Sequence, residues 1–209
     1  MKDLAPIVFV IDDDASVRRA IKRLIESIGL QVEMFGSTQE FLLRKLPDAP
    51  SCLVLDVRLP GISGLDFQGQ LIQTGLLIPI IFISGHGDIP MTVRAMKAGA
   101  VEFLPKPFRD QDLLDAIQLG LEKDRSRRRL EAEQTILRDR FALLTSRERE
   151  IVAMVVTGML NKQIAAKIGI TENTVKVHRS RAMDKMQAQS LPELVQMLGK
   201  LSPNLRKAS

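Results

Sequence analysis

Polar residues that end several short apolar runs have the types needed to hold a cation and attack an electrophile. They are Asp12, Asp13, Asp56, Ser84 and Lys106. Neighbouring carboxylates repel one another at neutral pH, and a hard divalent cation such as Mg²⁺ removes that conflict. Asp56 could then act as a nucleophile toward phosphorus, while the metal, the lysine and the Ser84 hydroxyl meet the oxygens of the transferring group.

Each of these residues also has a simpler explanation when it is taken alone. The acids at positions 12–14 could cap a helix that follows them, and Asp56 could be a turn residue before Leu59-Pro60-Gly61. Lys106, which precedes Pro107, could lie in a solvated loop. Because these residues all occur at the ends of separate apolar runs, the pattern favours one shared site.

The elements that must position this site alternate between strands and helices. Short apolar runs typical of strands buried on both faces occur at residues 7–11, 31–35, 53–55, 80–83 and 101–104. Patterns typical of helices follow them at residues 17–28, 37–46, 64–73 and 89–98 and from residue 110 onward. This alternation predicts an α/β fold with a five-stranded, doubly wound parallel sheet, whose ligand site lies at the carboxyl ends of the strands. Later helices are predicted to begin at the N-caps Thr145 and Thr171, and Ser37 and Thr145 each have a glutamate three residues on, as in a capping box.

The charge is distributed unevenly between the two halves of the chain. Residues 1–121 carry a net charge of −3 and residues 122–209 one of +8, which together give the +5 of the whole chain. A basic half predicts an acidic partner, with double-stranded DNA the leading candidate, although a solvated basic surface would look the same. We predict a first domain over 1–121, a helical linker over 122–143, an all-α four-helix domain over 144–201 and a frayed tail over 202–209.

The apolar residues of the linker could be used in two ways. Leu130, Gln134, Leu137, Phe141 and Leu144 fall at alternating steps of four and three residues, as in a coiled coil. The stripe spans about two heptads, and a firm assignment needs about three or four. The same residues could equally pack against the chain's own second domain, so both interpretations stay open.

A turn at residues 169–171 separates a short predicted helix over 161–168 from a longer one that runs to about Met186. This arrangement fits a helix-turn-helix, whose second helix enters the major groove of DNA. Lys176, Val177 and Ser180 could meet base edges, and the residues able to reach phosphates are His178, Arg179, Arg181 and Lys185. An amphipathic helix with a wet basic side is the plain alternative.

Composition excludes several classes of protein. No run of about 18 apolar residues occurs, so we expect no transmembrane helix and no membrane partner, and the first residues lack the features of a secretory signal. The single cysteine, Cys52, excludes an internal disulfide framework, and we expect it in the core. His86 and His178 are too far apart to suggest a histidine-rich metal site, and we expect His86 in a surface loop. We therefore expect a cytoplasmic protein.

The motifs at the strand ends resemble those of the receiver domain of two-component response regulators. Ile11-Asp12-Asp13-Asp14-Ala15-Ser16-Val17-Arg18 resembles the acidic motif of that domain, and Leu55-Asp56-Val57-Arg58-Leu59-Pro60-Gly61-Ile62-Ser63-Gly64 resembles its phosphoacceptor motif. Ser84-Gly85-His86-Gly87-Asp88 and Phe103-Leu104-Pro105-Lys106-Pro107-Phe108 complete the pattern, which covers residues from about 7 to 121. Asp14 stands where the family often has glutamate.

The resemblance implies how the acidic pocket works. Asp56 would accept a phosphoryl group from a histidine kinase. Asp13, Asp56 and the backbone carbonyl of Arg58 would hold Mg²⁺, with Asp12 assisting through water.

It also implies a switch beside the pocket. Lys106 would contact a phosphoryl oxygen, and the Lys106–Pro107 bond would be cis. Ser84 would be the hydroxyl switch and Phe103 the aromatic switch. Their movement on phosphorylation would reshape the face made by the helix at 89–98 and the strand after it, and would bias that face toward dimerisation.

The second domain resembles the LuxR-type DNA-binding domain of NarL/FixJ regulators. The segments that carry the resemblance are residues 144–150, 161–165 and 174–179. It implies that residues 161–180 form the helix-turn-helix, that Asn161, Lys162 and Thr174 join the DNA-binding residues, and that the last helix serves dimerisation on DNA. The stretches at 85–88 and 96–100 are similar to the FixJ-type branch of the family.

These features predict a transcriptional regulator that is activated by phosphorylation and catalyses only the transfer and hydrolysis of its own phosphoryl group. One alternative is a phosphatase of the haloacid-dehalogenase type, because Asp12-x-Asp14 after an apolar strand resembles its opening motif. That family needs a later acidic pair at a strand end, whereas Asp110 and Asp112 fit a helix start. The other alternative is a DNA-binding protein whose receiver ignores phosphorylation, and the complete set of pocket residues argues against it.

Overall fold

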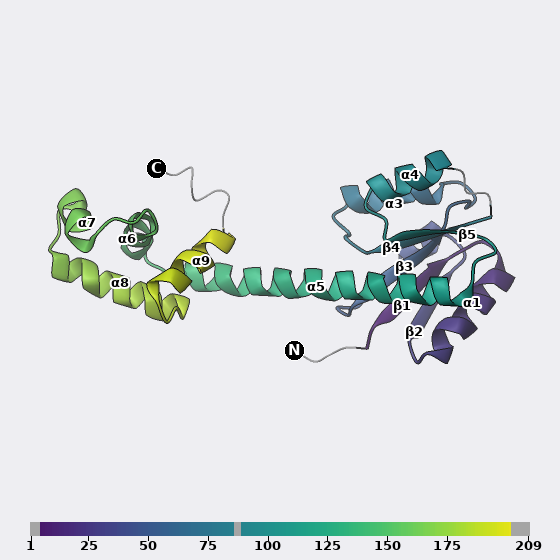
Figure 1. Cartoon of the computed structure of the whole chain (residues 1–209), viewed down its shortest axis with the longest axis horizontal. Coiled ribbons are helices and arrows are strands. Elements are labelled where there is room, and N and C mark those ends of the chain that lie inside the picture. Colours follow the sequence, from purple (N-terminus) through teal and green to yellow (C-terminus); the bar gives the residue numbers. More distant parts are fainter. Residues whose placement is uncertain (1–4, 86–88, 202–209) are drawn as a thin grey trace. The chain divides into compact units, whose positions relative to one another are not determined.

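The structure, a computed structural model, describes residues 5–85 and 89–201 (Figure 1). The predictions for the loop at His86 and for the tail over 202–209 lie outside the described residues. The chain divides into two compact units, Met1–Arg128 and Arg129–Ser209. The predicted linker therefore contributes residues to both units.

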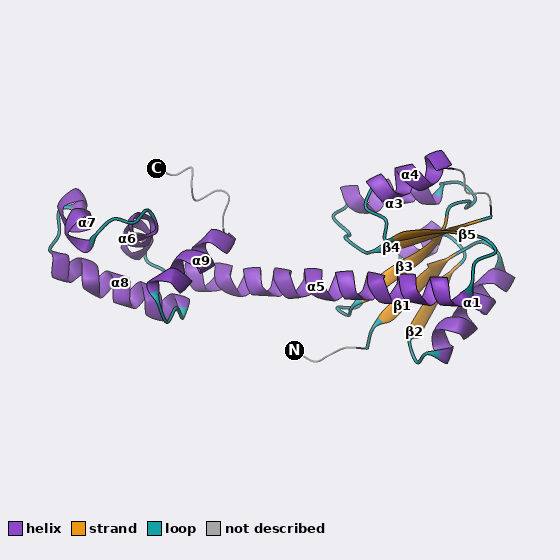
Figure 2. Cartoon of the chain, viewed as in Figure 1, coloured by secondary structure: helices purple, strands orange, loops and turns teal. Residues whose placement is uncertain are grey.

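The first unit is built on the predicted parallel sheet (Figure 2). Its strands are β1 (Ile7–Ile11), β2 (Gln31–Phe35), β3 (Ser51–Asp56), β4 (Ile80–Ser84) and β5 (Glu102–Pro105). They are hydrogen-bonded in the order β2-β1-β3-β4-β5, and every pair is parallel. The sheet reverses its order beside β1, which places the end of β1 next to the end of β3.

Helices cover both faces of the sheet, as the fully buried strands β1, β3 and β4 require. These helices are α1 (Ala15–Ser27), α2 (Thr38–Leu42), α3 (Gly64–Gln73), α4 (Ile89–Lys97) and the first part of α5 (Asp110–Ala142). α1 and α5 pack on one face around Ile25 and Ile117, whereas α2, α3 and α4 pack on the other around Phe41 and Phe67. Alternate residues of each strand serve the two cores.

The second predicted helix is shorter than the sequence pattern suggested. It was expected over residues 37–46, but α2 ends at Leu42. Ser37 caps it as predicted, by accepting from the amide of Glu40. Pro47 disfavours a helical conformation at Leu46, and Arg44 turns away to form a two-bonded ion pair with Glu33.

The second unit is entirely helical within its described residues. It contains the end of α5 together with α6 (Ser146–Val156), α7 (Asn161–Ile168), α8 (Glu172–Met186) and α9 (Leu191–Leu201). Thr145 and Glu148 form the capping box expected from their spacing. Gly169 ends α7 in the left-handed conformation, with φ 69°, and Thr171 caps α8.

The end of α5 packs against its own unit. Leu137 and Leu144 are buried, and Phe141 packs on the core that α6, α8 and α9 share. Leu130, at the start of the apolar stripe that could have made a coiled coil, is 57% exposed and takes no part in this packing. Of the two open interpretations, packing on the chain's own domain accounts for the buried part.

Two expectations from composition hold in the described residues. Cys52 is a fully buried residue of β3. No helix in residues 5–85 or 89–201 is both long and apolar enough to cross a membrane.

Candidate functional site

The strand ends bring together the residues that the sequence singled out. Asp12 follows β1, Asp56 is the last residue of β3, and Ser84 ends β4. Lys106 follows β5, and its backbone amide donates to the carbonyl of Ser84 at 2.7 Å. Because these strands are parallel, the side chains converge at a single edge of the sheet.

Three carboxylates form the centre of this pocket. One oxygen each of Asp12, Asp13 and Asp56 lies within 4.8 Å of the others. Asp12 and Asp56 are buried, and Asp13 is exposed. Such a set of oxygen ligands, partly open to solvent, suits a hard divalent cation that keeps several waters.

Lys106 supplies positive charge to the pocket. Its Nζ lies 2.7 Å from Asp12 Oδ2 and 2.6 Å from Asp56 Oδ2. One ammonium group thus serves two buried carboxylates and cannot neutralise all three acids. The pocket has the charge to attract a further cation.

The pKa values in the pocket reflect this conflict. Burial raises the pKa of Asp12, and the hydrogen bonds from Lys106 and from the amide of Asp14 only partly offset the rise. Burial alone would lower the pKa of Lys106, but its hydrogen bonds to Asp12 and Asp56 outweigh burial and raise it.

Asp14, the third of the three consecutive acids, has a structural role instead. Asp14 caps α1, where its side chain accepts from the amides of Ser16 and Val17. The Ser16 hydroxyl also donates to it and lowers the pKa of Asp14. The capping explanation therefore applies to Asp14, whereas Asp12 and Asp13 belong to the pocket.

The segment after Asp56 is held against the pocket. The amide of Arg58 donates to Asp56 Oδ1 at 2.8 Å and fixes that carboxylate. A Cβ at Gly64 would lie 2.4 Å from the carbonyl oxygen of Asp56, so only glycine lets α3 begin there. The motif's last glycine thus has a steric reason.

The two predicted switch residues lie on neighbouring strands. Ser84 is 1% exposed at the end of β4, and Phe103 is buried on β5. The Phe103 ring lies 6.2 Å from that of Phe82, which pairs with it across the sheet. The Lys106–Pro107 bond is cis, as expected.

Sequence reasoning assigned no role to one residue at this edge, although Arg18 belongs to the segment that resembles the acidic motif. Arg18, on α1, donates from its guanidinium to the backbone carbonyl of Asp12. It therefore holds the loop that carries Asp12 and Asp13. No spacing rule points to it, because its partner is a main-chain atom.

The second candidate surface is the helix pair α7–α8. The side chains of Ile164 and Val175 are buried between the two helices and fix their packing. Within the predicted DNA-binding set, the exposed residues are Lys162, Lys176, Val177, Ser180 and Arg181. A row of cationic and small side chains on α8 is what major-groove contact requires.

The other predicted DNA-binding residues are half-buried, namely Asn161, Thr174, His178, Arg179 and Lys185. Arg179 donates to the Asn161 side chain at 3.3 Å and joins α8 to α7. Lys185 lies 2.7 Å from the buried carboxylate of Glu148 on α6. These contacts hold α8 against α7 and against α6.

Two family models match the chain. The "Response regulator receiver domain" matches residues 8–118, and "Bacterial regulatory proteins, luxR family" matches residues 142–198. The chain belongs to the response regulators.

Similar proteins share both domains of this response regulator. It is 55% identical over 193 residues to Nodulation protein W of Bradyrhizobium diazoefficiens, covering 91% of this chain and 84% of that protein. It is 43% identical over 190 residues to Transcriptional regulatory protein FixJ of Azorhizobium caulinodans, covering 91% and 90%. The solved structure of Response Regulator StyR is 50% identical, with a TM-score of 0.85 over 94% of this chain and 100% of that one.

These similarities confirm the predicted family, fold class and general function. The response regulator combines a receiver domain with a LuxR-type DNA-binding domain, and its relatives include FixJ-type transcriptional regulators. Neither the phosphatase nor the phosphorylation-independent alternative is favoured by them.

Proposed function

We propose that Asp56 accepts a phosphoryl group from a partner histidine kinase, and that the modified receiver dimerises and strengthens binding of the second domain to promoter DNA. A carboxylate oxygen of Asp56 forms the new bond to phosphorus while the donor's phosphorus–nitrogen bond breaks. The proton needed by the leaving imidazole comes from solvent or from the kinase. The chain's own catalysis is limited to this transfer and the later hydrolysis.

The observation that carries this proposal is the position of Lys106 between two buried acids. Its ammonium lies within 2.7 Å of both Asp12 and Asp56, and hence beside the oxygen that would attack phosphorus. A phosphoryl group on Asp56 would bring oxygens to which the same ammonium can donate. Ser84 ends the neighbouring strand, and its hydroxyl would donate to another of them.

The three acids fit Mg²⁺, which would be held by Asp13, Asp56 and the carbonyl of Arg58, with Asp12 acting through water. When bound, the ion supplies positive charge against the oxygens of the transferring group. The carboxylate separation within 4.8 Å and the exposure of Asp13 support a partly hydrated ion.

The face for dimerisation is carried by α4. Ile89, Val93 and Met96 lie on one side of this helix and are 80%, 44% and 41% exposed. Solvent-facing apolar residues at steps of four and three are typical of helix association surfaces. α4 leads directly into β5, the strand of Phe103, so a change at that ring can reach this face.

DNA binding is assigned to α7 and α8 together. Lys176, Val177 and Ser180 would meet base edges, because they are exposed on α8. The contacts to phosphates are assigned to His178, Arg179, Arg181 and Lys185, and the remaining members of the DNA-binding set are Asn161, Lys162 and Thr174. The net charge of +8 over residues 122–209 favours binding to the phosphates of DNA.

The phosphorylation step is tested with acetyl phosphate and Mg²⁺ on the full chain. We expect intact-protein mass spectrometry to show one added phosphoryl group on the wild type and none on Asp56→Asn. Asp66→Asn, which removes an exposed acid from α3, is the matched control and should be modified normally. Full modification of the Asp56→Asn protein would refute the assignment.

The DNA-binding step is tested by titrations at several salt concentrations. Loss of Arg181, an assigned phosphate contact, should weaken binding to all sequences and reduce the salt slope by about 1. Loss of Lys176 should instead change the preference among sequences, by about 1–3 kcal/mol at the base it reads. Equal effects of the two substitutions on every sequence would contradict base reading by Lys176.

A further inference from the structure

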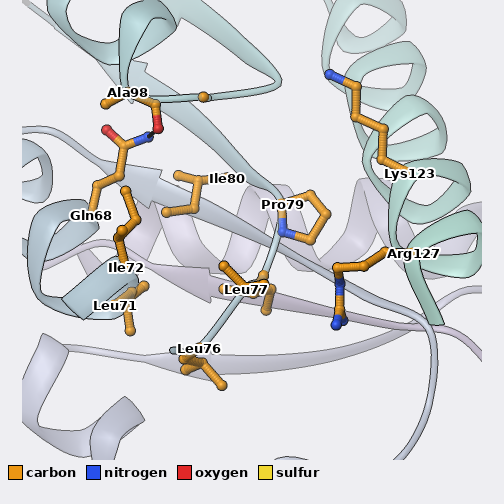
Figure 3. A pocket seen from close by; sticks show the side chains of 12 residues that line it. Gln68, Leu71, Ile72, Leu76, Leu77, Pro79, Ile80, Ala98, Lys123 and Arg127 are labelled. Atoms are coloured by element: carbon orange, nitrogen blue, oxygen red, sulfur yellow. Dashed lines mark hydrogen bonds between the residues drawn. The ribbon is translucent and has the colours of Figure 1, made fainter. Parts of the chain in front are cut away.

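A cavity lies at the end of the receiver sheet opposite the acidic pocket (Figure 3). Its volume is about 390 Å³, within the usual range of small-molecule sites. Its walls come from the end of α3, the segment that leads into β4, the end of α4 and the middle of α5. All of these belong to the first unit, and the cavity shares no residue with the phosphorylation pocket.

One wall of the cavity is apolar. Leu71, Leu76 and Pro79 line it, and two further lining residues, Ile72 and Leu77, are 50% and 53% exposed. Large apolar side chains that face an open cavity gain free energy when an apolar group covers them. The wall therefore favours the hydrocarbon part of a ligand.

The opposite wall is cationic. Lys123 and Arg127 lie one turn apart on α5 and both line the cavity, as their sticks in Figure 3 show. Asp124 holds the Arg127 guanidinium by accepting from its Nε at 3.1 Å. The Lys123 ammonium has no hydrogen bond or ion pair within the part of the chain that the structure describes.

No acid among the described residues lines this cavity. The Arg127 guanidinium is already paired with the buried carboxylate of Asp124, so an anionic ligand would pair with the Lys123 ammonium of this wall. The amide of Gln68, the remaining polar side chain, is already engaged, because its Nε2 donates to the Ala98 carbonyl at 3.2 Å. The charges of the cavity thus select for a negative head group.

We propose that this cavity binds a small amphipathic carboxylate, with its hydrocarbon body against Leu76, Leu77 and Pro79 and its carboxylate paired with the Lys123 ammonium. Apolar and cationic walls that face each other match the two halves of such a molecule. A phosphate or another compact polyanion would leave the apolar wall uncovered. Binding here is independent of Asp56, so the site would act as a second input to the receiver.

The proposal is tested with hexanoate and the full-length chain, by calorimetry and by amide NMR shifts. We expect saturable binding with Kd on the order of 1 mM, as suits a ligand of this size. The uncharged analogue hexanol should bind about fivefold more weakly, because it lacks the charge that pairs with Lys123. The shifts should centre on residues 71–80 and 123–127.

Two variants separate the two walls. Lys123→Gln should weaken hexanoate about fivefold and leave hexanol unchanged, whereas Leu77→Ser should weaken both ligands. Lys45→Gln removes an exposed lysine away from the cavity and should change neither. Asp56→Asn should bind hexanoate normally, so that a failed phosphorylation assignment would not be mistaken for a failure here.

Several results would overturn the proposal. They are equal binding of hexanol and hexanoate, no effect of Lys123→Gln, and shifts centred elsewhere. An acidic peptide that binds at these residues while hexanoate does not would assign the site to a protein partner and would likewise refute a small-acid site.

Discussion

Buried carboxylates lie at both ends of the receiver sheet, and their surroundings are opposite. At the carboxyl ends of the strands, Asp12 is fully buried near two other acids. It pairs with the Lys106 ammonium, which it shares with Asp56. At the amino ends, Asp124 is equally buried, but its carboxylate is surrounded by hydrogen-bond donors. It accepts from the amide of Ser51 at 3.0 Å and from two arginines, Arg127 and Arg128.

The difference separates functional from structural use of the same chemical group. The acids around Asp12 repel one another, and burial raises the pKa of Asp12, so a bound cation would stabilise this end of the sheet. Asp124 has more positive partners than it needs and joins α5 to the start of β3. A buried carboxylate thus indicates a binding site only where its charge is left uncompensated.

The largest expected effect comes from breaking the compensated end. Asp124→Ala leaves the Ser51 amide and two guanidinium groups without their acceptor, and should lower the free energy of unfolding by about 3 kcal/mol. Urea unfolding followed by circular dichroism measures this, since the chain has no tryptophan or tyrosine. The Asp48 side chain, the outer partner of Arg128, is 97% exposed. Asp48→Ala should therefore lower the free energy of unfolding by less than about 0.5 kcal/mol. A similar loss of stability for both variants would show that Asp124 contributes no more than an exposed ion-pair partner.

The helical unit offers a second compensated carboxylate and a smaller effect. Glu148 is 3% exposed, accepts from the amide of Thr145 at 2.8 Å and pairs with Lys185. Glu148→Ala should therefore destabilise this unit by about 2 kcal/mol, a value reduced by the partial exposure of Lys185. Hydrogen exchange of peptides from α6 and α8 measures the loss. Glu150→Ala, at an exposed pair with Arg147, should change little.

The same carboxylate predicts a pH dependence with a defined sign. Burial would raise the pKa of Glu148, but the hydrogen bonds from Lys185 and Thr145 outweigh burial and lower it below its ordinary value of about 4.5. An acid with a lowered pKa stabilises the fold above its unfolded value, and this contribution is lost as the pH falls through the folded value. The difference between wild type and Glu148→Ala should thus be full at pH 7 and shrink below about pH 4.5. A constant difference would contradict the ion pair.

The sequence predicted the uncompensated end well and the compensated one poorly. Asp12, Asp56, Ser84 and Lys106 each end an apolar run, and the rule for parallel sheets then brings them together. Asp124 lies in a stretch rich in charge, where nothing distinguishes it from its neighbours. Its burial depends on Ser51, which is 73 residues away and meets it only in the fold.

The helices show the same limit. The capping residues Thr145 and Thr171 were identified from local spacing, because a cap involves only residues of the first turn. The use of Leu130 and Leu137 was left open, because a helical stripe does not specify what covers it. The structure buries Leu137 in its own unit and leaves Leu130 exposed.

Mg²⁺ should sharpen the comparison between the two ends of the sheet. At ten times its Kd, an ion that binds only the folded receiver raises the free energy of unfolding by about 1.4 kcal/mol. Hydrogen exchange should slow in peptides of the receiver and stay unchanged in α6–α9. Asp124→Ala should keep this Mg²⁺ response, whereas Asp56→Asn should reduce it. An equal response in both units would indicate nonspecific binding of the ion.

The smallest expected effect has the opposite sign and is the strictest test of the comparison. Asp12→Asn removes one of three mutually repelling charges and keeps a group of the same shape, so the metal-free receiver should gain up to about 1 kcal/mol at pH 7. Because the pKa of Asp12 is raised in the fold, its charged form is disfavoured there, and the gain should vanish at low pH, where the carboxyl is already neutral. The variant should respond less to Mg²⁺, as a site for the ion requires. A loss of stability as large as that of Asp124→Ala would mean that Asp12 is also a structural acid, and that the two ends of the sheet do not differ in kind.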